Sequence, residues 1–192
     1  QLVLSIHDFA IQHVYPMANP TTGEQISVAA TGGYGRQEMA PHSDIDLLFL
    51  LPYKKTAHSE QIIEFMLYML WDLGLKVGHA TRSVDESIRL ARQDLTICTS
   101  LLECRWLMGG EQLYRDFKLR FAEEVVAKDQ LGFTDAKLEE RDKRHASMGD
   151  TRYVLEPNIK EGKGGLRDLQ TLFWIAKFIY KVDDVSQLVD QD

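Results

Sequence analysis

Residues 31–50 read TGGYGRQEMAPHSDIDLLFL and place two glycines, an arginine and two alternating aspartates ahead of a run of Leu and Phe. The segment QISVAATGGY, which overlaps its start, is short and β-branched and predicts a strand that stops at the glycines. The segment DIDLLFLL predicts a second strand, and because it is apolar beyond its first few residues, that strand is expected to be central in a sheet.

The two aspartates of this stretch point to a metal site. Asp44 and Asp46 are two residues apart on a predicted strand, so their side chains leave one face about 6 to 7 Å apart. Two carboxylates so close repel each other unless a cation lies between them, and such hard oxygen ligands suit Mg²⁺. Gly32 and Gly33 would let backbone N–H groups approach a polyphosphate, and Arg36 could neutralise it. The arrangement predicts a site for a metal-bound nucleoside triphosphate.

A simpler interpretation stays open for parts of this pattern. GGYG alone is typical of a tight turn, and SDID could be a turn-capping aspartate followed by a solvent-facing one. The combination favours the site, because carboxylates at the start of an otherwise apolar strand need a compensating partner.

The remaining pattern of the first half is mixed α/β. Residues 2–15 have helical spacing, and YPMANPTTGE then breaks it with two prolines and a glycine. A helix is expected from Ser59, with Gly74 at its C-terminal end. LKVGHATR predicts a third strand, and Ser83 with Glu86 predicts a capping box for the next helix.

The second half reads as helical. Leu95, Cys98, Leu102 and Trp106 predict one helix that GG at 109 and 110 ends, and helical patterns continue beyond it. A last helix is expected to carry Leu169, Leu172, Phe173, Ala176 and Ile179, with Trp174 and Tyr180 as packing residues rather than base-stacking ones. We therefore expect an α+β fold, a small mixed sheet flanked by helices over residues 1–93, followed by a helical domain over residues 94–192.

Composition limits the classes of function. The 192 residues are 44% hydrophobic, enough for a packed core, and the net charge of −7 argues against a nucleic-acid partner. The cysteines Cys98 and Cys104 would be about 9 Å apart along one helix, too far for a disulfide. Without a signal-like start or an apolar stretch of membrane length, a cytoplasmic location and no membrane association are expected. The chain starts mid-pattern at Gln1, so we expect it to be part of a longer one.

Two stretches resemble a known family. Gly32-Gly33 followed by Asp44-Ile45-Asp46 resembles the signature of DNA polymerase β-like nucleotidyltransferases. The longer segment GGYGRQEMAPHSDIDLLFL is similar to the corresponding segment of bacterial PII uridylyltransferase/uridylyl-removing enzymes. A second stretch, EPNIKEGKGGLRDLQTLFWIAK from Glu156 to Lys177, is similar to the block that follows the transferase core in the same enzymes.

The resemblance implies transfer of UMP from UTP to a tyrosine of the PII nitrogen-signalling protein, with release of pyrophosphate. Asp44 and Asp46 would be the catalytic and metal-binding residues, with Mg²⁺ or, in its place, Mn²⁺. The nucleotide would be bound by Gly32, Gly33, Arg36 and Ser43.

The general base is not assigned by the resemblance. The superfamily usually places a third carboxylate on a neighbouring strand, whereas this chain has His79 there. A histidine on a strand is more often structural, and Glu161 and Asp168 are alternatives in the second motif.

The segment NIKEGKGGLRD carries Lys160, Lys163 and Arg167 beside three glycines. It could close over the triphosphate or over the PII loop, or it could be a glycine turn before a helix. It is not a P-loop, because Gly-Lys-Ser/Thr is missing.

Other functions stay open. A related nucleotidyltransferase, such as an adenylyltransferase of the glutamine synthetase-modifying type, shares a similar glycine block. A degenerate domain that only binds nucleotide or PII is the non-enzymatic alternative. The HD-type hydrolase and ACT domains of the family are not visible in the sequence, and His7-Asp8 is interpreted as a coincidental HD pair, so removal of UMP and control by glutamine are not expected of this chain.

Overall fold

The computed structural model describes residues 1–14, 26–40, 42–53, 55–148 and 158–181. The proline-rich break after residue 15 and the first two residues of the second motif, Glu156 and Pro157, lie outside these ranges. In chain order the elements are α1 (Leu2–Phe9), the π-helical turn η1 (Ala10–Val14), β1 (Ser27–Thr31), α2 (Gly32–Gly35), β2 (Ile45–Leu51), α3 (Ala57–Asp72), β3 (Val77–Ser83), α4 (Val84–Ala91), α5 (Leu95–Leu102), β4 (Arg105–Gly109), α6 (Glu111–Phe121), the π-helical turn η3 (Ala122–Val126), α7 (Gln130–Ser147) and α8 (Leu166–Tyr180). The fold is α+β, as expected.

The sheet is four-stranded and mixed, in the order β3-β2-β1-β4. β1 pairs antiparallel with both β2 and β4, and β2 pairs parallel with β3. β2 is therefore an inner strand, as its apolar sequence predicts. The register places Asp46 opposite Thr31 on one side and Gly78 on the other.

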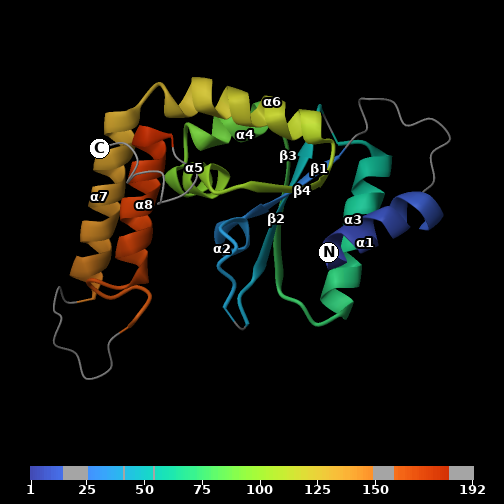
Figure 1. Cartoon of the computed structure of the whole chain (residues 1–192), viewed down its shortest axis with the longest axis horizontal. Helices are drawn as coiled ribbons and strands as arrows, with labels where there is room; N and C mark the ends of the chain where they lie inside the picture. Colours follow the sequence, from blue (N-terminus) through green and yellow to red (C-terminus); the bar gives the residue numbers. More distant parts are fainter. Residues whose placement is uncertain (15–25, 41, 54, 149–157, 182–192) are drawn as a thin grey trace.

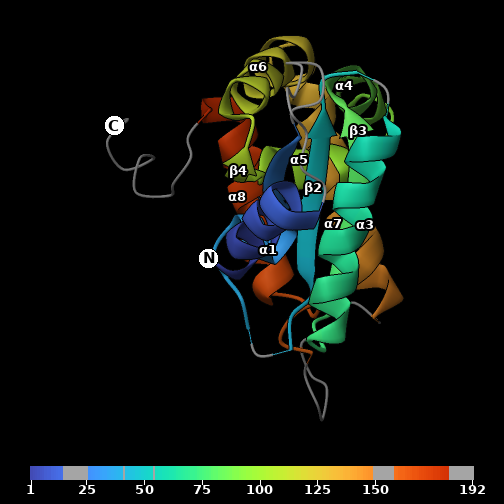
Figure 2. The ribbon, with the colours of Figure 1, turned by 90° about the vertical axis from the view of Figure 1, so that its right-hand side faces the viewer.

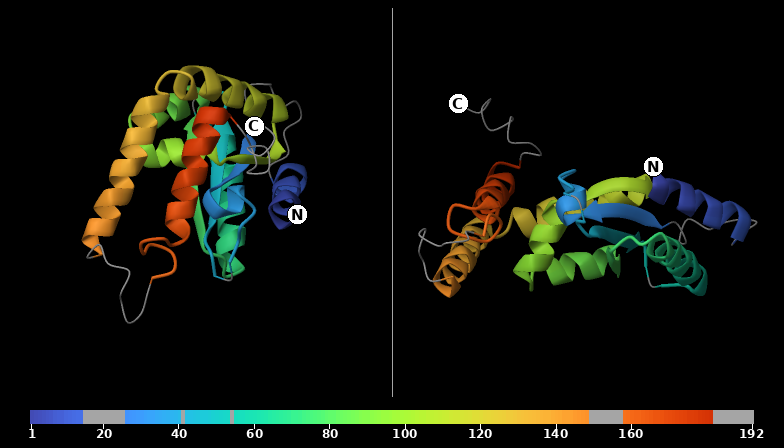
Figure 3. Two further views of the ribbon diagram at one scale, coloured as in Figure 1. Left: turned by 60° about the vertical axis from the view of Figure 1, so that its left-hand side comes forward. Right: turned by 90° about the horizontal axis from the view of Figure 1, so that it is seen from below.

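Alternate residues of β2 face two separate cores. Leu47, Phe49 and Leu51 pack with α1 and α3, whereas Leu48 and Leu50 pack with α4, α5, α6, α7 and α8. Figure 2 shows α1 and α3 on the near side of the sheet, and Figure 1 shows α7 and α8 side by side at the opposite end of the molecule. The view from below in Figure 3 confirms that the sheet separates these two groups of helices.

The expected helices of the first half are present, the helix expected from Ser59 starts two residues earlier, and the capping box expected at Ser83 and Glu86 forms only one of its two hydrogen bonds. α3 begins at Ala57 after the N-cap Thr56, whose hydroxyl accepts from the Ser59 N–H at 3.1 Å, and Gly74, with a φ of +75°, follows its end as expected. Ser83 caps α4, because its hydroxyl accepts from the Glu86 N–H at 3.2 Å. These caps satisfy backbone groups that the first and last turns leave without helical partners.

The expected single helix through Trp106 is wrong. α5 ends at Leu102, and β4 follows and pairs with β1, so Trp106 lies opposite Ala29 in the sheet. Apolar residues four apart fit a helix, but pairing with the open edge of β1 satisfies the backbone of residues 105–109 instead. Cys98 and Cys104 are consequently not on one helix, and both are buried free thiols. The sheet thus includes a strand beyond residue 93, and the division of the chain near that residue stays a prediction.

The expected last helix is present as α8, and Trp174 packs as expected, whereas Tyr180 is 55% exposed. The helix buries Thr171, Trp174 and Phe178, whereas Leu169 and Leu172 are 62% and 60% exposed. Apolar residues occur around most of this helix, so their periodicity does not decide which face packs. The stacked pair of Phe178 and Phe133, with centroids 3.9 Å apart, orients the helix on α7. In the described parts of the chain, no helix has the length and apolar character to cross a membrane.

Candidate active site

Asp46 occupies a slot between two glycines. It is the second residue of β2, and Asp44 directly precedes the strand. A Cβ at Gly78 would lie 2.5 Å from Asp46 Oδ1, and one at Gly32, whose φ is +56°, would lie 2.8 Å from Oδ2. Both glycines therefore make room for the carboxylate, Gly78 from β3 and Gly32 from the end of β1.

The charge of Asp46 is disfavoured by its surroundings. Its pKa is raised, first by burial and then by repulsion from Asp44. A bound divalent cation would relieve both effects, since it supplies opposite charge to two hard oxygen donors. Among the described residues, no group of three or more His, Cys, Asp or Glu side chains is arranged to hold a metal ion. The residues present thus fit a cation that takes its remaining ligands from substrate or water.

Arg36 is held by two carboxylates. Its Nη1 donates to Glu103 Oε2 at 2.6 Å and its Nε donates to Glu38 Oε2 at 2.9 Å. Burial alone would lower the pKa of Arg36, but the hydrogen bonds and charges of Glu103 and Glu38 raise it overall. Arg36 borders the same cavity as the acid pair, and its guanidinium is already compensated there by Glu103.

Sequence reasoning missed Glu103. It lies at the end of α5 with only 2% of its side chain exposed, and besides Arg36 it accepts a hydrogen bond from Trp174 Nε1 at 2.5 Å. Its one signal in the sequence is a charged residue inside the apolar run LLECRWLM. The partners that bury it lie 67 and 71 positions away, and no local pattern indicates them.

Ser43 lies in the turn that leads to Asp44. Its hydroxyl accepts from the Ala40 N–H at 3.1 Å, and its own N–H donates to the Ala40 carbonyl at 3.0 Å. The side chain therefore shapes the approach to the acid pair, and it also borders the cavity.

A cavity of about 1130 Å³ joins the acid pair to the helices of the second half. One wall is formed by the ends of β1, β2 and β3, and the other by α5, α7, α8 and the loop before α8. We call the second the cationic wall, because it carries Lys137, Arg144, Lys160 and Arg167. The carboxylates that border the cavity besides the acid pair each bind a cation in the structure: Glu38 binds Arg36, Glu103 binds Arg36, Glu140 binds Lys137, and Glu161 binds Arg167.

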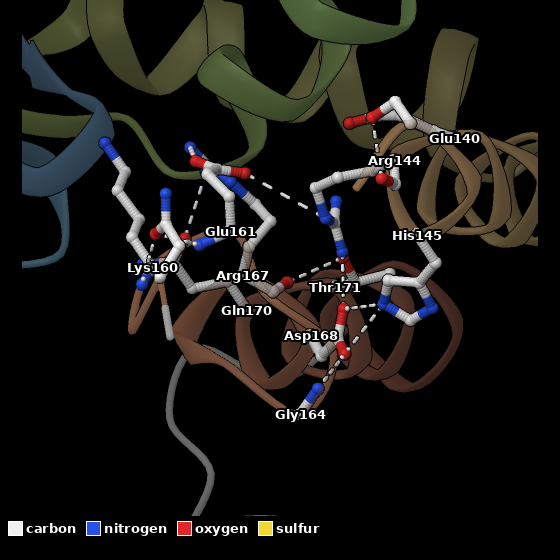
Figure 4. Close-up of polar contacts among 12 residues, drawn as sticks. Glu140, Arg144, His145, Lys160, Glu161, Gly164, Arg167, Asp168, Gln170 and Thr171 are labelled. Carbon is white, nitrogen blue, oxygen red and sulfur yellow. Dashed lines mark hydrogen bonds and ion pairs between the residues drawn. The ribbon is translucent and has the colours of Figure 1, made fainter. Parts of the chain in front are cut away.

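Asp168 joins α7 to the loop before α8 (Figure 4). It accepts from the Gly164 N–H at 2.7 Å, from Arg144 Nη2 at 2.5 Å, and lies 3.0 Å from His145 Nε2. Burial alone would raise the pKa of Asp168, but these hydrogen bonds lower it overall. So many donors give Asp168 a structural role and argue against it as a proton acceptor.

Some of the other residues of the second motif line the cavity, and others do not. Arg167 Nη2 donates to Glu161 at 3.2 Å and its Nη1 donates to Gln170 at 3.0 Å, beside Lys160 (Figure 4). Lys160, Glu161 and Arg167 border the cavity, whereas Lys163 is not among the residues that line it. The motif also forms a turn, in which Asn158 Oδ1 accepts from the N–H groups two and three residues further on. The turn is therefore present, and closure over a triphosphate stays a prediction.

His79 is not brought to the acid pair. Gly78 is the β3 residue on the Asp46 side of the sheet, and side chains alternate along a strand, so His79 faces the other side. Although the residue borders the cavity, its ring packs against Trp71 of α3 with centroids 6.1 Å apart. This geometry speaks against His79 as the general base.

Comparisons with known proteins agree with this site. Residues 20–102 match the family model described as "Nucleotidyltransferase domain", and residues 132–192 match the one described as "GlnD PII-uridylyltransferase". The first match spans the glycine turn and the acid pair. The chain therefore carries a nucleotidyltransferase domain, the class that these residues define.

Similar proteins indicate which kind of nucleotidyltransferase this chain resembles. Proteins named bifunctional uridylyltransferase/uridylyl-removing enzyme are 60% identical in Azospirillum brasilense over 98% of this chain and 60% identical in Rhodospirillum rubrum over 99% of it. Over this region the chain is therefore similar to bifunctional uridylyltransferase/uridylyl-removing enzymes, and it spans 20% of the length of these two relatives.

Solved structures give a weaker likeness. A crystal structure of a toxin-antitoxin with AMP-PNP matches with a TM-score of 0.35 and 17% identity, covering 78% of this chain and 94% of the other. At this TM-score the likeness supports no conclusion about this chain.

Proposed function

We propose that this chain transfers UMP from UTP to a tyrosine of a PII signalling protein and releases pyrophosphate. The observation that carries the proposal is the acid pair Asp44–Asp46, with Asp46 seated between Gly32 and Gly78, beside a cavity that Lys160 and Arg167 also border. Two similarities support the choice of substrates: the relatives are named for uridylyl transfer, and residues 132–192 match the model described as "GlnD PII-uridylyltransferase".

The proposed step is an in-line substitution at the α-phosphorus. The tyrosine Oη forms the new P–O bond, the bond to the bridging oxygen breaks, and the electron pair leaves with pyrophosphate. Mg²⁺, or Mn²⁺ in its place, would supply charge compensation for the phosphate oxygens when bound by Asp44 and Asp46.

The protein residues have separable roles in this proposal. Burial and repulsion from Asp44 raise the pKa of Asp46, and a cation bound with the triphosphate would offset both effects. The backbone of Gly32 and Gly33 and the side chain of Ser43 border the space where the triphosphate would lie. Lys160 and Arg167 of the cationic wall would balance its remaining charge. The tyrosine proton still needs an acceptor, and solvent or a carboxylate at the cavity would have to take it.

A binding-only role has one observation in its favour. In the described residues the acid pair is not joined by a third carboxylate that could complete a metal site. A domain that binds UTP without transferring UMP would fit that finding, and a measurement of transfer separates the two functions.

The test is the intact mass of a PII protein after incubation with this chain, Mg²⁺ and each nucleoside triphosphate in turn. We expect a gain of one UMP with UTP only. Asp46→Asn should abolish the gain, because it removes a charge at the metal and keeps the shape of the side chain. Asp72→Asn is the matched control, since Asp72 is an exposed carboxylate at the end of α3.

Three results would change the conclusion. A gain of AMP with ATP would place the chain with the adenylyltransferases. Binding of UTP without any gain in mass would favour the regulatory domain. Undiminished transfer by the Asp46→Asn variant would contradict the assignment of the site.

A further inference from the structure

Glu103 connects the two walls of the cavity. Its Oε2 accepts from Arg36, which follows the glycine turn, and its Oε1 accepts from Trp174 of α8. Arg36, Glu103 and Trp174 all border the cavity. A buried carboxylate with two directed donors is costly to disturb, because each donor left without it stays buried.

The backbone around Glu103 supports the glycine turn as well. A Cβ at Gly35 would lie 2.4 Å from the Glu103 carbonyl oxygen, so the turn packs directly against this residue. Arg105, two residues on, donates to the carbonyls of Tyr34 and Gly35 at 3.0 and 3.2 Å. Residues 103–105 therefore hold α2 in place through packing and hydrogen bonds.

Trp174 extends this link to the cationic wall. Lys137 Nζ lies 4.6 Å from the centroid of its ring, and the Arg167 guanidinium lies 5.6 Å from it. Lys137 is itself buried. A shift of Trp174 would thus disturb two cations that border the cavity.

We propose that Glu103 is a positioning residue of the nucleotide site, which fixes the distance between the glycine turn and the cationic wall through Arg36 and Trp174. The proposal rests on the proposed function, because it assigns Glu103 a part in nucleotide binding. Glu103 touches neither the nucleotide nor the reacting atoms in this role.

Glu103→Gln is the informative variant. The amide keeps the volume of the carboxylate but has one acceptor oxygen, so either Arg36 or Trp174 would face an NH₂ group. Glu124→Gln is the matched control, because Glu124 likewise binds two side chains, Arg92 at 2.7 Å and Arg120 at 2.8 Å, but on η3 and away from this cavity.

The first measurement is amide hydrogen exchange of the chain without nucleotide. Glu103→Gln should speed exchange both at residues 32–38 and in the first turns of α8, and leave α3 unchanged. Glu124→Gln should leave both regions as in the wild type. Exchange that is unchanged by Glu103→Gln, or faster throughout the chain, would overturn the proposal.

The second measurement is UTP binding in the presence of Mg²⁺. Glu103→Gln removes one charged hydrogen bond, either to Arg36 or to Trp174, and should therefore weaken UTP binding about tenfold. In the Trp174→Phe variant, Glu103→Gln should weaken UTP binding by a smaller factor, because the hydrogen bond between Glu103 and residue 174 is already absent. Equal effects in the two backgrounds would contradict the link through Trp174. A wild-type chain that binds no UTP would instead refute the proposed function, and the exchange result would still decide whether Glu103 joins the two walls.

Discussion

At the scale of single residues, the glycines around Asp46 differ in what they tolerate. A Cβ at Gly32 would meet Asp46 Oδ2 at 2.8 Å with an unfavourable φ, whereas a Cβ at Gly33 has its nearest neighbour, the Glu38 carbonyl oxygen, at 3.4 Å. We expect Gly32→Ala to lower transfer activity about a hundredfold, because it displaces the acid that holds the metal. Gly33→Ala is the control and should keep most of the activity in the same mass assay. Equal losses in both variants would show that the turn as a whole, rather than the slot, is needed.

The raised pKa of Asp46 predicts an effect on stability. A carboxyl whose pKa is higher in the folded protein favours folding while it is protonated, and that contribution is lost as pH rises through the folded pKa. Without metal, Asp46→Asn should therefore increase the free energy of unfolding at pH 7, and the difference should vanish below about pH 4. Chemical denaturation at both pH values in a chelating buffer measures this. A variant that is less stable than the wild type at pH 7 would mean that the charge of Asp46 is compensated in the folded chain.

Single residues also show how far the sequence predicts the site. Asp44 and Asp46 are recognisable because two acids entering an apolar strand break its pattern locally. Glu103 is not recognisable, because its importance depends on Arg36 and Trp174, which only the fold brings to it. His79 is misleading for the opposite reason: its position on the predicted strand is right, but the alternation of side chains turns it away from Asp46.

At the scale of elements, Asp168 holds the loop before α8 against α7. Its lowered pKa means that its charge stabilises the fold above the ordinary aspartate pKa, and that this stability is lost as pH falls through the folded value. We expect Asp168→Asn to lower the free energy of unfolding by about 1 to 3 kcal/mol at pH 7, because Arg144, His145 and the Gly164 N–H lose a charged acceptor.

The pH dependence of that loss distinguishes it from simple damage to packing. The difference between Asp168→Asn and the wild type should shrink as pH falls from about 4 towards the lowered folded pKa of Asp168, below which the aspartate is protonated in the folded protein as well. Asp142→Asn is the control, because Asp142 pairs with its neighbour Arg141 at the surface, and its effect should stay within about 0.5 kcal/mol. Denaturant titrations over this pH range measure both. A constant difference at every pH would assign the loss to something other than the charge.

Elements with clear caps were predictable, and those decided by pairing were not. Ser83 and Glu86, which are three residues apart, predict the start of α4, whereas apolar spacing places the start of α3 at Ser59 and misses its cap at Thr56. β4 depends on the edge of β1, which lies far earlier in the chain. The buried face of α8 depends likewise on Phe133 of α7.

At the scale of the whole molecule, the cavity is made by parts of the chain that are far apart in sequence. The acid pair and glycine turn come from residues 31–46, and the cationic wall comes from α7, the loop before α8, and α8 itself. Sequence reasoning assigned these parts to two domains, with the second motif either closing over the nucleotide or forming a turn. The structure brings that motif to the border of the same cavity, and it does so through contacts such as Arg36–Glu103–Trp174 that no local pattern contains.

This shared cavity predicts that nucleotide binding protects both walls together. With UTP and Mg²⁺ at about 100 times the dissociation constant, the free energy of unfolding should rise by about 2.7 kcal/mol. Hydrogen exchange should slow at residues 32–46 and at residues 160–170 at the same UTP concentration, because one ligand contacts the acid pair and the cationic wall. Asp46→Asn should remove the protection from both segments, whereas Asp72→Asn should leave it intact. Protection confined to the second segment would mean that the triphosphate binds the cationic wall without reaching the acid pair, and transfer of UMP would then require the two walls to move closer.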